Sequence, residues 1–374
     1  MGKPTIELIA FTPQDNPGAI LAADGKPLLL PGLIETCGRT CYKSPNPKTI
    51  ESARKFCSGI IANGHLAMSE FSWQVLEIKC RLSKDHATAL KEWNEFFEQI
   101  KDLEGLLYRK KIHLRYTLRQ NSSLLISGNI RAFRELANCA HRRDNCFVNA
   151  INRYFKSAQP DLFFDIIRRP PDDMLAINDQ PTDLDWDEQF EHLWFCFRAV
   201  GSRAFTHQLV RHRQDVDFAQ ESQRYCDESG FFDSDYFVMP PQFAEVGTEE
   251  FFLSSLKEAD GAYKKLLDFL ERFGVKGKAA KQDARFLLPN AVKSEICIAA
   301  PLSVWFPLFY LRCDPHAQWE IRNLMEQAQQ MIFKIVPEAE NRYQDYKKWR
   351  QSEDALRKAA AEDYLRSVGT PSTI

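Results

Sequence analysis

The residues from 202 to 225 combine cations, amides and hydroxyls at spacings that suit an anionic ligand. This segment reads SRAFTHQLVRHRQDVDFAQESQRY. On a helix, Arg203, His207 and Arg211 would share one face, because residues four apart are neighbours along a helix. The three cations at 211–213 repel one another unless an anion lies among them, and arginine binds phosphate through its forked guanidinium. The segment predicts an anion site, although an isolated Arg-His-Arg is more often a solvated helix end.

Helices and a few strands must position these side chains. Hydrophobic periodicity predicts strands at 5–11, 71–80 and 193–200. It predicts helices at 47–63, 84–103, 202–211, 248–273, 304–334 and 345–366. Pro47 suits the first turn of its helix, and Ser202 suits an N-cap. Long helices with a few strands indicate an α+β fold, and without a GxGxxG or Walker loop any nucleotide must be held in another way.

A change in composition divides the chain. Residues 81–187 are polar, with a basic stretch at 109–119 and a turn-forming RRPPDD at 168–173. We interpret 81–187 as an insertion. The catalytic core would then comprise 1–80 and 188–335, followed by a charged helical tail at 336–374.

Composition narrows the class of protein. The 374 residues carry a net charge of −2, so the whole surface does not attract polyanions, and the stretch at 109–119 alone does not indicate a nucleic-acid partner. The ten cysteines are scattered without a Cys-x-x-Cys pair, as expected for reduced thiols in a cytoplasmic protein without a metal site. No secretory signal and no apolar run of membrane-spanning length occurs, so we expect no membrane partner.

Five blocks in order resemble the flavin-dependent thymidylate synthase family. The strongest of them is RHRQDVDFAQESQRY (211–225), which resembles the family's Arg-His-Arg followed by Ser-x-Arg-Tyr. The others are GRTCYKS (38–44), NGHLAMSE (63–70), ARFLLPN (284–290) and YLRCDPHAQWEIR (310–322). The resemblance covers roughly 1–80 and 190–335 and leaves 81–187 and the tail unexplained.

The resemblance implies a fold, a reaction and an assembly. The fold is a core of long helices with a mixed or antiparallel sheet. The reaction converts dUMP to dTMP, with a carbon from methylenetetrahydrofolate, a hydride from FAD, and NADPH to reduce the flavin. No cysteine nucleophile is used, and none lies inside the signature here. The sites are shared between subunits of a homotetramer.

Roles follow by matching positions. Ser222 and Arg312 are implied to be catalytic. The implied nucleotide site comprises Gln208, Gln220, Ser222, Arg224, Arg285 and Arg312. The implied flavin site comprises His65, Glu70, Arg211, His212 and Arg213.

The chain departs from the family near this flavin site. Asp215 and Asp217 stand where small neutral residues are usual, so they must point away from an anion or meet an arginine. An Asn-x-Arg pair of the family is replaced by Pro301 and Ser303, and a further polar position is Pro307.

Two duplications leave the assignment open. The family's Glu-His reads Glu70-Phe71 here, while a second Glu-His stands at Glu191-His192. The segment ISGNIRAFREL (126–136) resembles the missing Asn-x-Arg block. It is either an ordinary helix start capped by Asn129, or a fold-back that lends Asn129 and Arg131 to the flavin after a tight turn at Gly128.

Two other functions remain open. One is the same chemistry on another uracil nucleotide, either UMP or a hydroxymethylation. The other is a nucleotide- or flavin-binding homologue without turnover.

Overall fold

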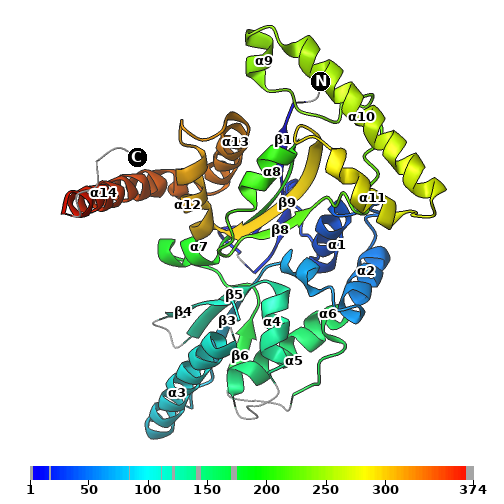
Figure 1. Cartoon of the computed structure of the whole chain (residues 1–374). Helices are drawn as coiled ribbons and strands as arrows, with labels where there is room; N and C mark the ends of the chain where they lie inside the picture. The colour runs from blue at the N-terminus through cyan, green and yellow to red at the C-terminus, as the bar shows by residue number, and fades with distance from the viewer. Residues whose placement is uncertain are drawn as a thin grey trace. The chain divides into compact units, whose positions relative to one another are not determined.

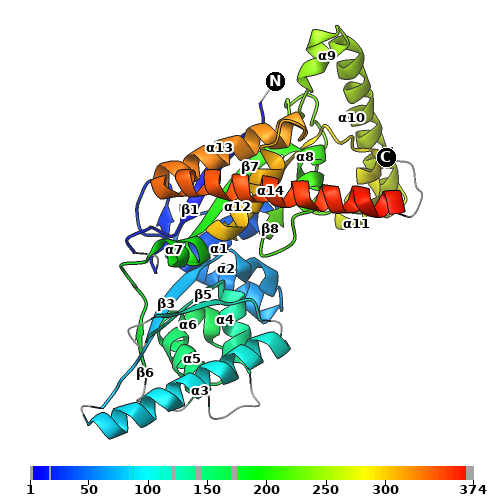
Figure 2. The ribbon, with the colours of Figure 1, turned by 90° about the vertical axis from the view of Figure 1, so that its left-hand side faces the viewer.

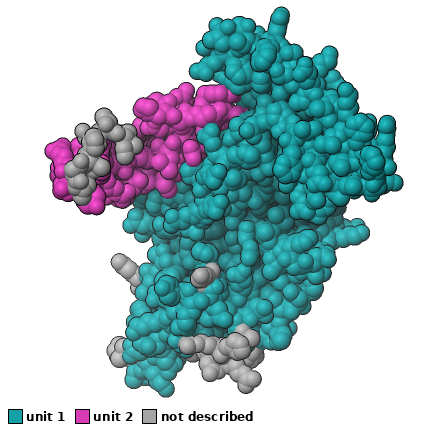
Figure 3. Space-filling view, in the orientation of Figure 1, with its two compact units in different colours: residues 1–304 teal, residues 305–374 magenta. Residues whose placement is uncertain are grey.

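Two antiparallel sheets organise the first and larger part of the chain. The computed structural model describes residues 3–16, 18–83, 85–110, 112–119, 123–139, 145–169 and 175–367. Contacts divide the chain into two units, 1–304 and 305–374 (Figure 3). The antiparallel sheets and many helices confirm the predicted α+β class. No helix among the described residues is long and apolar enough to cross a membrane.

The first sheet has the strand order β2-β1-β7-β9-β8. Its strands are β1 (Thr5–Phe11), β2 (Leu21–Ala22), β7 (Trp194–Ser202), β8 (Asp217–Gln220) and β9 (Lys293–Pro301). The long central pair is β7 and β9, which run antiparallel with Trp194 opposite Pro301 and Ser202 opposite Lys293. Because β7 leads into the signature segment and β8 lies inside it, this sheet positions the predicted site.

The second sheet has the order β4-β5-β3-β6. Its strands are β3 (Gln74–Cys80), β4 (Arg115–Arg119), β5 (Ser123–Gly128) and β6 (Leu175–Asn178). Three of these strands fall within 81–187, whereas β3 comes from the segment before it. One buried core includes both Trp73 and Leu125 and continues to Trp194 and Cys297 of the first sheet. The assignment of 81–187 as an insertion stays a prediction.

Helices lie beside both sheets of the first unit (Figures 1 and 2). Those before the first signature residue are α1 (Leu30–Thr40), α2 (Ile50–Ala62), η1 (Leu66–Glu70), α3 (His86–Lys110), α4 (Ile130–Ala137), α5 (Cys146–Ala158), α6 (Pro160–Phe163) and α7 (Trp186–His192). Those from the signature onward are α8 (Arg203–Leu209), α9 (Pro241–Glu245), α10 (Glu249–Arg272), α11 (Lys278–Ala284) and η2 (Arg285–Leu287). In Figure 1, α4 and α5 lie beside the second sheet, and α8 and α11 lie near the end of the first.

The second unit is helical. It contains most of α12 (Leu302–Arg312), then α13 (Trp319–Ile335) and α14 (Pro337–Ser367). The prediction of one helix at 304–334 is wrong, because the chain leaves the helix after Arg312. Gln318 then caps α13 by accepting from the amides of Glu320 and Ile321. The charged helix of the tail is confirmed and is longer than predicted.

Several predicted boundaries hold and others shift. The strands at 5–11 and 193–200 and the helix at 248–273 are confirmed within two residues. The Ser202 hydroxyl caps α8 by accepting from the amide of Phe205, as predicted. Pro47 is not in a first turn, because α2 begins at Ile50 with Thr49 as its cap. The turn predicted at 168–173 lies partly outside the described residues.

Candidate functional site

A pocket of about 500 Å³, here called the inter-sheet pocket, lies where the two sheets meet. Its lining comes from segments distant in sequence: Glu70, Trp73, Ile112, His113, Leu114, Arg115, Asn129, Arg131, Ala132, Glu135, Arg213, Asp215, Val216, Asp217 and Pro301. The structure therefore brings together predicted flavin residues from both halves of the chain, namely Glu70, Asn129, Arg131 and Arg213.

Asn129 has two contacts at this pocket. Its Oδ1 accepts from the amide of Ala132 at 2.9 Å, so the predicted cap of α4 is confirmed. Its Nδ2 donates to Asp217 Oδ2 at 3.5 Å. The chain passes from β5 at Gly128 directly into α4 at Ile130, as the predicted turn requires, although the φ of Gly128 is not positive. A Cβ at this position would lie 2.3 Å from Leu114 Cδ2, so a larger residue would require the leucine side chain to move.

Arg131 is held between two carboxylates. It forms ion pairs with Glu70 and, at 3.0 Å, with Glu135 one helical turn away. Burial raises the pKa of Glu70 despite the opposing charge of Arg131. Burial also raises the pKa of Asp217, and the nearby charge of Glu70 acts in the same direction. The surroundings of Glu70 and Asp217 therefore favour either a proton on one of these carboxyls or a cationic partner beside them.

Arg115 closes the other side of the pocket. It forms an ion pair with Glu191 and another with Asp215 at 3.0 Å, and it donates to the Ser303 hydroxyl at 2.9 Å. Asp215 thus meets an arginine, one of the two arrangements expected for it. His192 is buried between the hydroxyls of Ser127 and Thr117, at 2.7 and 3.0 Å.

Burial and the charge of Arg115 lower the pKa of His192 to about 3, so this imidazole is neutral near pH 7. A fully buried neutral histidine with both ring nitrogens bonded serves the packing of the sheet. Glu70, by contrast, faces the pocket. Neither Glu191 nor His192 is among the residues that line this pocket.

The Arg-His-Arg triplet lies beyond its helix. The prediction that Arg211 continues the face of Arg203 and His207 is wrong, because α8 ends at Leu209 and Val210 is its C-cap. Arg211 is exposed on the following turn, and Arg213 lines the inter-sheet pocket. Within the described part of the chain, Arg213 has no ion-pair or hydrogen-bond partner. His65 is exposed and does not line this pocket.

A second group of side chains, here called the nucleotide cluster, lies at the end of β8. It comprises Arg203, Gln220, Ser222, Arg224, Gln282 and Arg285. Gln220 Nε2 donates to the hydroxyls of Thr206 at 2.7 Å and Ser294 at 3.3 Å. Arg203 donates to the same Ser294 hydroxyl at 3.2 Å. Burial lowers the pKa of Arg203, and the charge of Arg285 adds to this effect.

Gln282 of α11 joins two arginines of the nucleotide cluster. Arg224 Nη2 donates to its side-chain oxygen at 3.5 Å, and Arg285 Nε donates to its carbonyl at 3.2 Å. Arg224 is exposed and therefore accessible to a ligand. Gln208 is half-buried on α8. Arg312 ends α12 in the second unit and is described there alone.

Beneath Ser222 lies a buried ionic network that the sequence did not predict. Lys43 Nζ lies 2.5 Å from Glu221 Oε1 and 3.4 Å from Glu228 Oε2. The Tyr236 hydroxyl donates to Glu221 Oε2 at 2.8 Å. Burial and the charge of Glu221 raise the pKa of Glu228 to about 8. Glu221 adjoins the signature serine, but no spacing in the sequence indicates that Lys43 reaches it.

The Lys43 network fixes the backbone that carries Ser222. The amide of Ser222 donates to the carbonyl of Cys41 at 3.0 Å, so the signature loop is tied to the GRTCYKS block. Lys43 itself has a positive φ of 47°. This is an uncommon conformation for a lysine, and the surrounding contacts must hold it.

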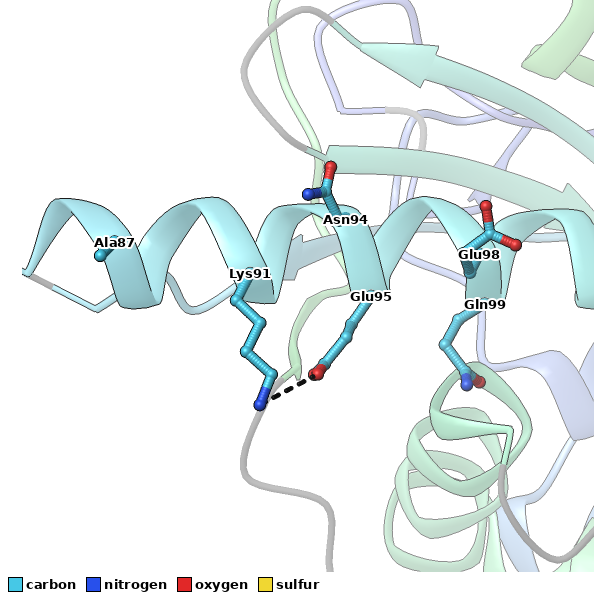
Figure 4. A pocket seen from close by; sticks show the side chains of 6 residues that line it. All are labelled: Ala87, Lys91, Asn94, Glu95, Glu98 and Gln99. Carbon is cyan, nitrogen blue, oxygen red and sulfur yellow. Dashed lines mark ion pairs between the residues drawn. The ribbon is translucent and has the colours of Figure 1, made fainter.

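Another pocket, on the exposed face of α3, contains none of the predicted site residues. Figure 4 shows its lining by Ala87, Lys91, Asn94, Glu95, Glu98 and Gln99. Its one drawn ion pair joins Lys91 and Glu95 at 3.8 Å. This is an ordinary solvated helix surface.

A family model and several known proteins match parts of this chain. Residues 173–338 match the family model described as "Thymidylate synthase complementing protein". The chain is 40% identical over 150 residues to a flavin-dependent thymidylate synthase of Nitratidesulfovibrio vulgaris, covering 40% of this chain and 59% of that protein. It is 34% identical over 161 residues to one of Clostridium tetani, covering 40% and 63%. It is 35% identical over 167 residues to one of Geobacter sulfurreducens, covering 44% and 67%. The chain thus spans about 60% of the first two relatives.

Proposed function

Because the chain belongs to the flavin-dependent thymidylate synthase family, we propose that it converts dUMP to dTMP by reductive methylation. Methylenetetrahydrofolate would supply the carbon, NADPH the reducing equivalents, and FAD would carry the hydride. The observation that carries the proposal is that Arg213 of the signature and Glu70 of the NGHLAMSE block line one pocket.

The donors of the inter-sheet pocket fit an anionic flavin nucleotide. Arg213 is without a partner among the described residues, and Arg131 has further N–H donors beyond those that it gives to Glu70 and Glu135. Guanidinium groups bind phosphate through paired hydrogen bonds. Of the pocket's carboxylates, Asp215 pairs with Arg115, Glu70 and Glu135 pair with Arg131, and burial favours the protonated form of Asp217. His65, Arg211 and His212 would complete the flavin contacts.

A bound flavin would supply hydride-transfer chemistry, while the protein binds and orients the reactants. The nucleotide cluster fits a nucleoside monophosphate because Arg224 and Arg285 converge on Gln282. We assign the phosphate to these arginines. Gln208, Gln220 and Ser222 would bind the uracil, and Arg312 would stabilise the negative charge that develops on the ring.

Ser222 is proposed as a catalytic residue that touches the uracil. Its position depends on the hydrogen bond from its amide to Cys41 and on the Lys43 network beneath it. No cysteine is required. Cys226, the thiol nearest to the signature, is buried, and burial raises its pKa to about 11, so it is a poor nucleophile at pH 7.

The colour of the purified protein tests the proposal. We expect a yellow protein whose flavin absorbance is bleached by NADPH under anaerobic conditions. A colourless protein that binds no added FAD would contradict it. A yellow protein that NADPH cannot bleach would favour a binding homologue without turnover.

We also propose a homotetramer with sites shared between subunits. Light scattering at falling protein concentration, with free FAD measured in parallel, tests the assembly. We expect dissociation to release FAD, and an active monomer would refute the assembly.

A further inference from the structure

The two sheets of the first unit contain strand pairs of the same construction. Trp194 at the start of β7 lies opposite Pro301 at the end of β9. Gln74 of β3 lies opposite Gly128 of β5. Extending this second register by one residue places Trp73 opposite Asn129. In both pairs the second strand leads into a helix, α12 after Pro301 and α4 after Asn129.

The side chains around the two tryptophans correspond as well. Glu70 and Glu191 each stand three residues before their tryptophan. Arg131 and Ser303 each stand two residues after the position opposite it. Arg131 forms an ion pair with Glu70, and the Ser303 hydroxyl lies 3.5 Å from Glu191 Oε2. The corresponding positions therefore contact each other in both pairs, through an ion pair in one and through a hydroxyl in the other.

The two corresponding tryptophans also meet each other. The rings of Trp73 and Trp194 stack with centroids 6.3 Å apart and planes 10° from parallel. Contact between equivalent residues is what a twofold relation between the two copies would produce. Strand register, glutamate contacts and ring stacking thus agree on one correspondence.

We infer that residues 66–137 and 187–304 are diverged copies of one unit, and that the first copy supplies the amide and guanidinium that the second has lost. The ligand is a phosphate-bearing flavin in the inter-sheet pocket. Pro301 has no side-chain donor and no backbone N–H, and Ser303 has no charge. Asn129 and Arg131 hold the corresponding positions and line the pocket together with Arg213 of the second copy.

In the second copy, the position that corresponds to this site is filled by contacts within the protein. Arg115 from β4 pairs with Glu191 and donates to Ser303. These two residues correspond to Glu70 and Arg131 of the first copy, so Arg115 takes up the contacts that a ligand would need. Arg115 also pairs with Asp215 at 3.0 Å. One chain should therefore hold one flavin, although it contains two copies of the unit.

The first copy lies outside the residues that match the family model, 173–338, so the match gives it no role. The inference rests on the proposed function only for the identity of the ligand. The correspondence of the two copies stands on register and contacts.

Five variants of the full chain test the inference by FAD titration, with fluorescence and calorimetry as readouts and thermal unfolding as a check on folding. Arg131→Met and Glu70→Gln alter the first copy, and Ser303→Ala and Glu191→Gln alter the corresponding positions of the second. Asn129→Asp is a fifth variant that keeps the helix cap but places a carboxylate beside Asp217.

We expect one FAD per wild-type chain. Arg131→Met and Asn129→Asp should weaken FAD binding by about tenfold or more, since a charged hydrogen bond is lost or a repulsion is added. Glu70→Gln should change FAD affinity, whereas Glu191→Gln and Ser303→Ala should change it by no more than about twofold. Unchanged affinity in Arg131→Met and Asn129→Asp, or a loss in Ser303→Ala, would overturn the inference.

The proposed function can fail separately. If FAD binds and depends on Arg131 as expected but no turnover of dUMP occurs, the inference holds and the proposed reaction does not. If the wild-type protein binds no FAD, both are overturned.

Discussion

The nucleotide cluster and the inter-sheet pocket are held in place by different contacts. Ser222 stands above the buried Lys43–Glu221–Glu228 network, and Gln220 is fixed by two hydroxyls. The pocket is lined by ion pairs of half-exposed side chains, such as Arg131 with Glu70. A buried network positions atoms rigidly, whereas half-exposed pairs exchange partners at small cost. We therefore expect the nucleotide cluster to be preorganised and the pocket to rearrange around its ligand.

The largest effect should come from removing the cation of the buried network. Lys43→Met leaves Glu221 and Glu228, both buried, without their positive partner. Breaking a buried pair in this way costs about 3–5 kcal/mol, and the partial exposure of Lys43 favours the lower end. Urea denaturation measures the free energy of unfolding. Lys347→Met on the exposed face of α14 is the control, and equal stability of the two variants would remove the network's structural role.

The next effect concerns the nucleotide cluster. Arg224→Ala should weaken dUMP binding by about 1.5–3 kcal/mol, the range for a hydrogen bond to a charged group. FAD binding should be unchanged, because Arg224 does not line the inter-sheet pocket. Calorimetric titrations with dUMP and with FAD measure both effects. An unchanged dUMP affinity would remove Arg224 from the phosphate site.

The stability that the buried network beneath Ser222 contributes should depend on pH. Glu228 has a pKa of about 8 in the folded protein and an ordinary value of 4.5. The folded state therefore holds a proton that the unfolded state has released between these values, so this residue's contribution to stability falls as pH rises from 4.5 to 8. Glu228→Gln should flatten the stability profile in that window, as measured by thermal unfolding at several pH values. A profile parallel to that of the wild type would contradict the assignment.

The smallest effect should come from the rim of the pocket. Asp215→Asn removes the 3.0 Å ion pair with Arg115, but Asp215 is 35% exposed. We expect a loss of stability below about 1 kcal/mol, since pairs in contact with solvent contribute little. Chemical denaturation measures it. A loss above that of Lys43→Met would reverse the proposed contrast between the two regions.

Local patterns predicted the elements that depend on neighbouring residues. The apolar run at 193–200 and the hydroxyl of Ser202 predicted β7 and the cap of α8 because a strand face and a cap are decided within a few positions. The break after Arg312 was missed, since both flanking segments are apolar enough to continue a helix. Arg211 was misplaced because the end of α8 has no glycine or proline to mark it.

The site was predictable only in part, for a physical reason. The resemblance to the family predicted Glu70 and Arg213 as flavin residues. For Asn129 and Arg131, the sequence left open whether they begin an ordinary helix or contact the flavin. Their meeting in one pocket depends on the pairing of β3 with β5, which lie more than forty residues apart. Lys43 reaches Glu221 across a still longer separation. Long-range pairing of this kind has no periodicity or spacing to reveal it.

Anaerobic turnover of dUMP tests the central claim most directly. The wild-type protein is supplied with dUMP, methylenetetrahydrofolate, FAD and NADPH, and the product is identified by mass, with UMP in a parallel reaction. We predict dTMP from dUMP and no product when NADPH is omitted. A hydroxymethylated product, or a product from UMP alone, would replace the reaction by its nearest alternative, and unchanged dUMP in the presence of bound FAD would contradict the proposed activity.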